Sequence, residues 1–386
     1  MGNVPHLRFP EFSGEWVTKS INDLAVVIGG GTPDTTVKSY WDGEIQWFTP
    51  SEIGKNKYVD SSLRTITEVG LNNSSAKLLP PNTILLSSRA TIGECSLSLR
   101  ECATNQGFQC LVSKKCNVDF LYYLIQTKKK DLIRKSCGST FLEISANEVR
   151  KIQVSVPSDV EQQKIAELLS LIDERIATQN KIIEKLQSLI KGLNNTLQYD
   201  TGGKSVCLGD ILLERSERSQ TNNQHEVLSS TVKGIFSQRE YFSKDIASEN
   251  NVGYKIIRLH DVVLSPQNLW MGNINYNDRF EIGIVSPSYK VFSIADGYDN
   301  QFVAAMLKTH RALYSYMMVS EQGASIVRRN LNMEAFSQLV FKIPSLDKQR
   351  EIGYAISLLK SQLKTANKII KAYTSQKQYL LRQMFI

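Results

Sequence analysis

The sequence predicts an α+β protein with two similar mixed α/β domains, separated by two long helices that form an antiparallel coiled coil. Apolar residues recur at alternating steps of four and three along two long segments, which is the period of a coiled-coil seam. The second segment repeats the first at a fixed offset, because Ile352 stands 187 positions after Ile165. Each segment also follows a globular block of similar length. These observations indicate an internal pseudo-two-fold repeat.

Length and composition set the outer limits of this prediction. The chain has 386 residues, which is too long for one hydrophobic core. Its 41% hydrophobic and 22% charged residues are typical of an ordinary soluble protein. No apolar run reaches the length of a membrane span, and the first residues do not resemble a signal peptide. We therefore expect a cytoplasmic protein that makes no membrane contact.

The cysteines and histidines do not form a recognisable metal or disulfide pattern. No C-x-x-C pair occurs, and the four histidines are scattered, so zinc and a disulfide framework are not expected. We predict reduced thiols. The six cysteines are Cys95, Cys102, Cys110, Cys116, Cys137 and Cys207.

The net charge of +8 suggests an anionic partner. Most of this charge lies in the last segment, where residues 345–386 contain eight bases and two acids. The globular blocks are therefore only weakly basic. If they contact nucleic acid, they do so through local patches, or a partner protein supplies much of the phosphate contact.

Residues 1–157 form the first globular block, and we interpret them as the first of two domains. One helix is predicted near residues 119–134, and Gly138 follows it. Short apolar runs bounded by Gly and Pro predict strands at residues 25–28, 45–48, 83–86, 108–112 and 152–156.

The first long helix is predicted over residues 158–199, and its seam spans roughly 50 Å at about 1.5 Å per residue. Ser158 and Glu161 have the spacing of a capping box at its start. For a heptad helix taken alone, simple oligomerisation or core packing is as good an explanation as a spacer role, but the duplication favours a partner helix in the same chain. The seam residues are Ile165, Leu169, Ile172, Ile176, Gln179, Ile183, Leu186, Ile190, Leu193 and Leu197.

Residues 200–344 repeat the plan of the first block, with a helix near residues 300–320 and a final strand at 339–343. The second long helix follows over 345–386, and we expect the helix pair to set the distance between the two domains. Lys348 replaces the capping Glu, and Lys377 lies on the seam, where we expect it to loosen the C-terminal end. The seam residues are Ile352, Ile356, Leu359, Leu363, Ala366, Ile370, Tyr373, Lys377, Leu380 and Met384.

No catalytic site emerges from the motifs. Residues 202–205 resemble the end of a phosphate loop, but Gln198 stands where the motif needs glycine. The Gly29–Gly31 run has Asp34 in place of the third glycine of a dinucleotide fingerprint, so a tight turn explains it better. We therefore predict no catalytic residue, no metal and no cofactor in this chain.

Polar and aromatic residues near the strand ends of the first block indicate binding. Arg89 directly follows an apolar strand, and Asn105 and Gln106 precede another. Arg is the commonest bidentate reader of guanine, and Asn and Gln read adenine. Thr32 and Trp47 complete the predicted DNA-binding set in this block. For each residue the alternative is a hydrogen bond that closes its own loop.

The corresponding loop of the second block contains Gln267 and Trp270, and Arg328 and Arg329 follow a Gly-Ala-Ser break. We predict that these four residues also contact DNA. For the arginine pair, contact with phosphates and a solvated surface without a ligand remain equal alternatives.

Taken together, these motifs resemble the specificity subunit of a Type I restriction–modification enzyme, and the resemblance covers essentially the whole chain. The motifs that carry it are Leu-Arg-Phe-Pro-Glu-Phe at 7–12, Gly-Gly-Thr-Pro at 30–33, Tyr-Trp at 40–41, Ser-Arg-Ala at 88–90 with Gly93, Asn-Gln-Gly at 105–107, Gly-Ser-Thr at 138–140, and Pro-Ser at 157–158 with Glu-Gln-Gln-Lys-Ile at 161–165.

The resemblance implies two target-recognition domains that each read one half of a split double-stranded DNA sequence. It also implies that the long helices bind methyltransferase subunits, two being expected, which hold S-adenosylmethionine. Restriction and translocase subunits that use ATP join the same complex, which serves bacterial defence. This chain would be its non-catalytic subunit. The second block lacks Gly-Gly-Thr-Pro and Ser-Arg-Ala, so the identities of the half-sites stay open.

A second function class remains as an alternative. The chain could be a coiled-coil adaptor with two protein-binding domains and no DNA recognition. DNA binding that weakens steeply with salt separates the two classes. A free-standing nuclease is disfavoured, because the sequence contains no recognisable carboxylate cluster or metal-ligand pattern.

Overall fold

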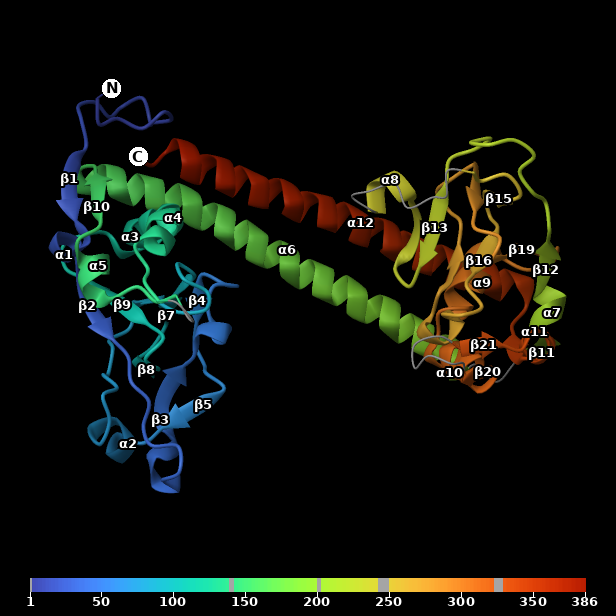
Figure 1. The fold of residues 1–386 in the computed structure, drawn as a ribbon, viewed down its shortest axis with the longest axis horizontal. Coiled ribbons are helices and arrows are strands. Elements are labelled where there is room, and N and C mark those ends of the chain that lie inside the picture. The colour runs from blue at the N-terminus through green and yellow to red at the C-terminus, as the bar shows by residue number, and fades with distance from the viewer. Residues whose placement is uncertain (1, 139–141, 200–202, 242–249, 323–328) are drawn as a thin grey trace. The chain divides into compact units, whose positions relative to one another are not determined.

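The computed structural model describes residues 2–138, 142–199, 203–241, 250–322 and 329–386. The chain divides into two compact units. Unit 1 consists of Met1–Lys181 and Lys368–Ile386, and unit 2 consists of Ile182–Asn367. Each unit therefore contains one globular domain and one end of each long helix (Figure 1).

The two long helices are α6 (Asp159–Tyr199) and α12 (Leu346–Gln383). In unit 1, Lys377 pairs with Asp173, and Arg175 lies over the ring of Tyr373. The contacts advance along α6 as they retreat along α12, so the helices are antiparallel there. This confirms the predicted antiparallel pair.

The seam of each long helix is buried or half-buried, while the positions between its residues are mostly exposed. In unit 1, Ile165, Leu169 and Ile172 lie in the core cluster that also holds Leu380 and Met384. The half-buried seam residues of unit 1 also include Ile176, Gln179, Ile370 and Tyr373.

The same seam continues in unit 2, where Leu186, Ile356 and Ala366 are buried. Ile183, Ile190, Leu193, Ile352, Leu359 and Leu363 are half-buried there. The side chain of the predicted seam residue Leu197 lies outside the described residues. The period of four and three therefore identified the interior face of both helices.

The described residues of unit 1 form three antiparallel or mixed sheets. A two-stranded sheet, which we call the frame sheet, pairs β1 (Val17–Ser20) with β10 (Gln153–Val156). A five-stranded sheet has the order β2-β9-β6-β7-β4, and a three-stranded sheet has the order β5-β3-β8. The bounds are β2 Ala25–Gly29, β3 Trp41–Phe48, β4 Tyr58–Val59, β5 Arg64–Ile66, β6 Ile84–Leu86, β7 Cys95–Ser98, β8 Cys102–Thr104 and β9 Gln109–Ser113.

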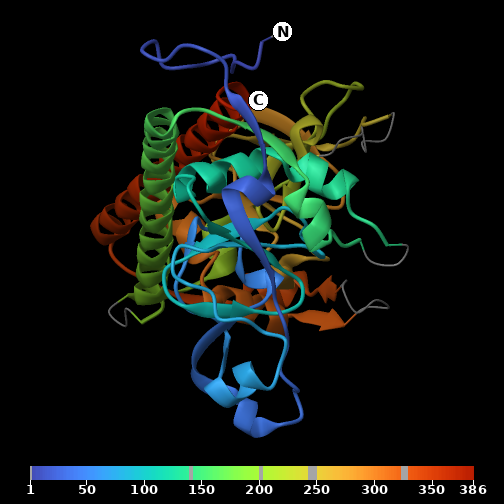
Figure 2. The same cartoon turned by 90° about the vertical axis from the view of Figure 1, so that its left-hand side faces the viewer.

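The helix predicted near 119–134 is two helices, α3 (Val118–Thr127) and α4 (Lys129–Arg134), which meet at Lys128. Asn117 caps α3 through its side chain, and the helix buries most of its apolar residues in the core. The remaining helices of unit 1 are α1 Ile21–Leu24, α2 Glu68–Asn72, α5 Ala146–Arg150, η1 Lys38–Tyr40 and η2 Pro50–Glu52. Figures 1 and 2 both show α2, β3 and β5 projecting from the end of unit 1 that lies opposite β1.

Unit 2 pairs β11 (Lys204–Cys207) with β22 (Val340–Ile343) as its frame sheet. A four-stranded sheet has the order β12-β19-β16-β17. Its other described strands form the pairs β13-β14, β15-β18 and β20-β21. The bounds are β12 Leu212–Arg215, β13 Leu228–Thr231, β14 Gly234–Ser237, β15 Lys255–Arg258, β16 Val262–Leu264, β17 Ile274–Tyr276, β18 Ile282–Val285, β19 Lys290–Ile294, β20 Ser320–Gln322 and β21 Arg329–Leu331.

The helix predicted near 300–320 is likewise divided into α9 (Asn300–Met306) and α10 (His310–Met318). Thr309 caps α10 with its side chain, which starts a new helix instead of extending the first. The remaining helices of unit 2 are α7 Leu208–Ile211, α8 Gln238–Tyr241, α11 Met333–Ser337 and η3 Leu269–Met271.

The repeat is exact in the frame and inexact in the middle of each domain. Val17 pairs with Val156 in β1-β10, and Lys204 pairs with Ile343 in β11-β22, each 187 positions later. The central strands β6 and β16 begin only 178 positions apart. The length differences therefore lie within the domains, between the frame strands.

Two glutamines one repeat apart join each long helix to its globular domain. The Gln162 side-chain oxygen accepts from the backbone N–H of Asn117 (3.1 Å), and that of Gln349 accepts from Asp299 (3.0 Å). Asn117 and Asp299 are the residues that cap α3 and α9. The amide group of each glutamine also donates to the carbonyl of the proline that precedes its long helix.

The capping box predicted at the start of α6 is half formed. The Ser158 hydroxyl accepts from the backbone N–H of Glu161 (3.4 Å). The Glu161 carboxylate instead accepts from the Arg8 guanidinium (2.8 Å) and from the indole N–H of Trp16 (3.3 Å). This buried carboxylate therefore fastens the N-terminal segment onto α6.

The expectation that Lys377 loosens the end of α12 is wrong. Its ammonium lies 2.7 Å from Asp173, and both side chains are about one-seventh exposed, at 16% and 14%. The hydroxyl of Tyr123 donates to the other oxygen of Asp173 (2.7 Å). Burial, and then the charge of Asp173, raise the pKa of Tyr123, so it stays a donor. A paired cation on the seam ties α12 to α6 and α3.

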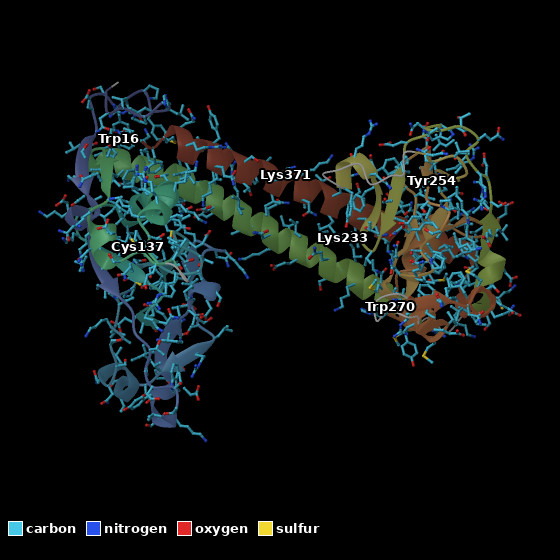
Figure 3. All side chains as sticks on the ribbon, viewed as in Figure 1. Trp16, Cys137, Lys233, Tyr254, Trp270 and Lys371 are labelled. Atoms are coloured by element: carbon cyan, nitrogen blue, oxygen red, sulfur yellow. The ribbon has the colours of Figure 1, made fainter. Side chains whose placement is uncertain are left out.

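Cys95, Cys102, Cys110 and Cys116 are buried, and burial raises the pKa of each thiol to about 12. All six cysteines are free thiols, as predicted, and Cys137 is exposed (Figure 3). In the described part of the chain, no helix has the length and apolar character needed to cross a membrane.

Candidate nucleic-acid interface

The Gly-Gly-Thr-Pro segment of unit 1 is held by close backbone packing. A Cβ on Gly30 would lie 2.0 Å from the carbonyl oxygen of Asn105, and one on Gly31 would lie 2.3 Å from the backbone nitrogen of Ala76. Only glycine fits these approaches. Gly31 also donates its N–H to the carbonyl of Thr104 (2.8 Å). The segment is thus fixed against the turn that contains Asn105.

Two tryptophans hold this segment by hydrogen bonds to its backbone carbonyls. The Trp47 indole donates to the carbonyl of Gly31 (2.9 Å), and that of Trp41 donates to the carbonyl of Asp34 (3.1 Å). Their rings form an edge-to-face pair at 5.1 Å. Trp47 is only 5% exposed. Trp47 therefore positions the segment. Its ring is not presented to a ligand, which the predicted DNA-binding role had assumed.

Thr32 and Gln106 meet at the surface, because the Thr32 hydroxyl is hydrogen-bonded to the Gln106 side-chain oxygen. Asn105 behaves differently. Its side-chain oxygen accepts from the backbone N–H of Gly107 (2.9 Å), which is the loop-closing role that was its alternative. Gln106 therefore offers its amide group at the surface, while the carboxamide oxygen of Asn105 shapes the turn.

Arg89 lies beside the same turn, since the neighbouring Ser88 donates its N–H to the carbonyl of Gly107 (2.8 Å). The Arg89 guanidinium is 2.8 Å from the carboxylate of Glu143. The pair lines a cavity of about 1050 Å³, and an ion pair of Lys129 with Glu94 lies on its wall. Arg89 must exchange Glu143 for DNA before it can read a base.

In unit 2, three of the four predicted DNA-binding residues come together. The Arg329 guanidinium lies over the Trp270 ring, 4.8 Å from its centroid, and the Arg329 backbone N–H donates to the carbonyl of Gln267 (3.1 Å). The Arg329 Nε is buried and has no hydrogen-bond acceptor. Trp270 is labelled in Figure 3. Arg328 lies outside the described residues.

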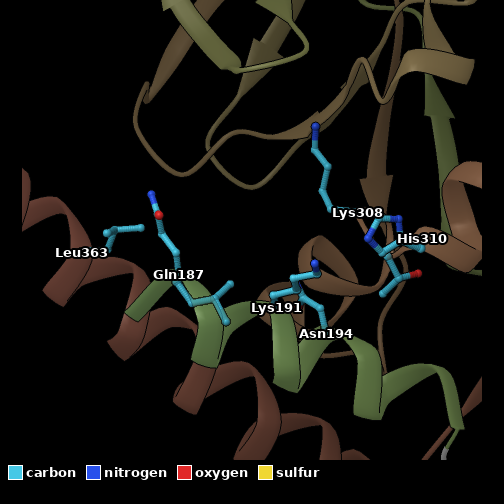
Figure 4. Close-up of a pocket in the computed structure, with 8 residues that line it drawn as sticks. Gln187, Lys191, Asn194, Lys308, His310 and Leu363 are labelled. Carbon is cyan, nitrogen blue, oxygen red and sulfur yellow. The ribbon is translucent and has the colours of Figure 1, made fainter. Parts of the chain in front are cut away.

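Lys308 braces the loop that carries Trp270. Its ammonium donates to the carbonyl of Gly272 (2.7 Å), the residue that ends η3. Burial, and then the like charge of Lys360, lower the pKa of Lys308 to about 8. Lys308 also lines a cavity of about 220 Å³ with Lys191 and His310 (Figure 4).

Sequence reasoning missed one arginine at the surface of unit 1. Arg64 lies with its guanidinium carbon 3.5 Å from the centroid of the Trp41 ring. It starts β5, whose pairing with β3 sets Arg64 opposite Trp47. The sequence did show an arginine at the start of a short apolar run and tryptophans in an earlier one. It could not show which tryptophan Arg64 stacks on, because that depends on how the strands pack.

Each unit thus combines a repeated frame with surface loops that carry arginine, amide and aromatic side chains. Among the described residues, no group of three His, Cys, Asp or Glu side chains is placed to hold a metal ion. A repeated frame that carries such loops is typical of a modular recognition protein.

Residues 13–188 match the family described as Type I restriction modification DNA specificity domain. The chain is 40% identical over 279 residues to the specificity subunit of the Type I restriction enzyme MjaIX of Methanocaldococcus jannaschii, covering 66% of this chain and 64% of that relative. It is 30% identical over 201 residues to the EcoR124I/EcoR124II specificity subunit of Escherichia coli, covering 50% of this chain and 48% of the relative. The chain thus aligns with less than two thirds of each relative's length.

The fold also matches a solved structure. The S subunit of the Type-I restriction-modification system from M. genitalium superposes with a TM-score of 0.63, covering 99% of both chains at 16% sequence identity. At this identity the likeness concerns the fold. The matched family model and relatives do not favour the coiled-coil adaptor.

Proposed function

We propose that this chain is the non-catalytic specificity subunit of a Type I restriction–modification complex, and that each unit reads one half of a bipartite DNA target. The observation that carries the proposal is the contrast between an exact frame and divergent loops. The paired positions of the frame strands recur at the offset of 187, whereas the second block lacks the Gly-Gly-Thr-Pro and Ser-Arg-Ala motifs of the first. A protein that binds two copies of one sequence would not need different loops.

The surface chemistry of each unit supports DNA as the ligand. Gln106 and Thr32 in unit 1, and Arg329 on Trp270 in unit 2, place donors and acceptors at loop surfaces. Arginine and the side-chain amides are the residues that read base edges in the major groove. The modest charge of the globular blocks means that partner proteins supply part of the phosphate contact.

The long helices carry a repeated outer face as well as a repeated seam. Leu171 and Leu358 are exposed and stand 187 positions apart, and so do Ile182 and Ile369. Exposed apolar side chains that recur in both repeats fit two copies of one partner protein. We place the docking of two methyltransferase subunits on these residues.

The remaining chemistry belongs to those partners. S-adenosylmethionine is held by the methyltransferase subunits, and ATP by the restriction and translocase subunits that join through the complex. The contribution of this chain is to bind DNA and to orient the partners on it, in the cytoplasm.

The test is to express the full chain with its methyltransferase subunits and to sequence the DNA of the host for methylation. We expect one bipartite motif, and no methyl transfer by the purified chain alone. Exchange of residues 15–150 for the matching block of a relative should change one half of the motif. A motif that changes in both halves, or that depends on one unit only, contradicts the proposal.

A further inference from the structure

The turn that leads into β5 presents an unusual pair of neighbours. Leu63 is 86% exposed, the highest value among the large apolar side chains of the described residues. Arg64 follows it, and its guanidinium carbon lies over the Trp41 ring, 3.5 Å from the centroid. Exposure of an apolar side chain to water is unfavourable, so a ligand that covers Leu63 would lower the free energy of the complex.

This turn is rigid, because side chains from two other elements hold its backbone. Leu63 donates its N–H to the Glu52 carboxylate (2.6 Å), and Ser62 donates its N–H to the side-chain oxygen of Gln46 (2.7 Å). The Ser62 hydroxyl in turn donates to the carbonyl of Arg64 (2.7 Å). The exposure of Leu63 is therefore a fixed feature of a well-bonded turn.

Arg64 differs from the other arginines in the globular part of unit 1, all of which are described. Each of those donates to an oxygen within the unit, whereas Arg64 has no such acceptor and contacts Trp41 instead. The pairs are Arg8 with Glu161, Arg89 with Glu143, Arg100 with Asp60, Arg134 with Asp131, and Arg150 with Asn147 and the Val27 carbonyl.

Trp41 gives the guanidinium a fixed plane. The indole is 7% exposed, is bonded to the carbonyl of Asp34, and packs edge-on against Trp47. Stacking occupies one face of the guanidinium and leaves its in-plane N–H groups free. A guanidinium in a fixed plane suits two acceptors that lie in that plane.

Guanine offers such a pair in its O6 and N7 atoms at the edge of the major groove. A phosphate would accept from Arg64 as well, but it offers nothing apolar to Leu63. A base edge does, because the methyl group of thymine lies in the same groove. The two neighbours together therefore favour a base edge over the sugar–phosphate backbone.

We propose that Arg64 is a specificity-determining residue of unit 1 that reads a guanine through O6 and N7, while Leu63 packs on the apolar edge of the adjacent base pair. The inference rests on the proposed function, in which unit 1 reads one half-site. It adds a named reader and a named base to that half-site.

The experiment uses the full chain in complex with its methyltransferase subunits and duplexes that carry its motif. At each guanine of the unit 1 half-site in turn, 7-deazaguanine removes the N7 acceptor. At one guanine we expect wild-type affinity to fall about 10-fold or more. Arg64→Gln should bind the natural site about that much more weakly, and it should lose nothing further on the 7-deaza duplex.

Arg100→Gln is the matched control, because Arg100 is an exposed arginine of the same unit that is already paired with Asp60. It should keep wild-type affinity and the same sensitivity to 7-deazaguanine. Leu63→Ser should relax the position next to the guanine and leave the guanine itself required. Thermal unfolding of each variant checks that unit 1 is intact.

Two results overturn the inference. An Arg64→Gln complex that keeps the guanine requirement shows that Arg64 is not its reader. An equal loss on all sequences, with a shallower salt dependence, makes Arg64 a phosphate contact. Either result leaves the proposed function standing if the wild-type complex methylates a bipartite motif. Absence of such a motif in the wild type instead refutes the proposed function.

Discussion

The two units share a frame but differ in what fastens the long helices to it. In unit 1, Asp173 and Lys377 form a shielded ion pair across the helix pair. The residues one repeat away in unit 2 are Lys360 and Ile190, and desolvation lowers the pKa of Lys360. One repeat has an ion pair at these two positions, and the other has a lysine and an isoleucine. The comparison teaches that the backbone repeat is strict while the chemistry of each layer is free to vary.

The starts of the two long helices differ in the same way. Glu161 is buried and binds Arg8 and Trp16 of the N-terminal segment. Its counterpart Lys348 is exposed and pairs with Glu351 one turn away. The N-terminal segment of unit 1 therefore has an anchor on α6, and α12 uses the same position only for a surface ion pair.

The largest effect should come from breaking the polar layer of unit 1. Lys377→Met leaves the shielded Asp173 carboxylate with Tyr123 as its remaining partner, so we expect a loss of about 3 kcal/mol in the free energy of unfolding of unit 1. The double variant Asp173→Leu/Lys377→Met should recover most of it, because a well-packed apolar pair replaces a buried ion pair at little cost. Urea unfolding monitored in unit 1 measures both. Equal destabilisation by the single and double variants would show that the charge is not the cause.

The two glutamine contacts should be equivalent in the two units. Gln162→Ala and Gln349→Ala each remove the acceptor of a capping residue's N–H and the donor to a proline carbonyl. We expect about 1–3 kcal/mol for each, the cost of leaving buried polar groups without partners. Hydrogen exchange at the start of α3 and of α9 localises the effect. A loss confined to one unit would mean that the repeat is geometrical but not energetic.

A difference between the units should also appear with pH. Lys308 has a folded-state pKa of about 8, below its ordinary value of 10.5. Between these values the unfolded chain binds more protons than the folded chain, so the stability of unit 2 should rise as pH increases from about 8 to 10. Lys308→Met should reduce this rise, and the remainder comes from Lys360 and Lys255 of unit 2, because burial also lowers their pKa values. Thermal melting of wild type and variant across this pH range is the measurement, and an unchanged slope in the variant would assign the rise to another group.

The smallest effect is expected at the start of α12. Lys348→Ala breaks an exposed pair within one helical turn, so the free energy of unfolding should change by less than about 1 kcal/mol. Arg8→Ala, which removes the partner of the buried Glu161, is the contrasting variant and should release the N-terminal segment. Limited proteolysis of this segment distinguishes the two. Similar cleavage of both variants would remove the distinction between the helix starts.

Several features followed from the sequence alone, because they depend on period and spacing. The heptad pattern located the interior face of α6 and α12, since residues at steps of four and three fall on one side of a helix. The offset of 187 located the repeated frame, including strands that are far apart in the chain. Both signals are local or purely additive, so no knowledge of packing was needed to detect them.

The structure decided which side chains within that frame can act. Trp47, predicted to contact DNA, is buried and donates to the Gly31 carbonyl. Arg64 lies over Trp41, although the register of β3 and β5 pairs it with Trp47. Lys377 looked like a flaw in the seam until Asp173, about two hundred residues earlier in the sequence, was brought beside it. Such pairings join residues whose separation along the chain carries no periodic signal, so only tertiary packing determines them.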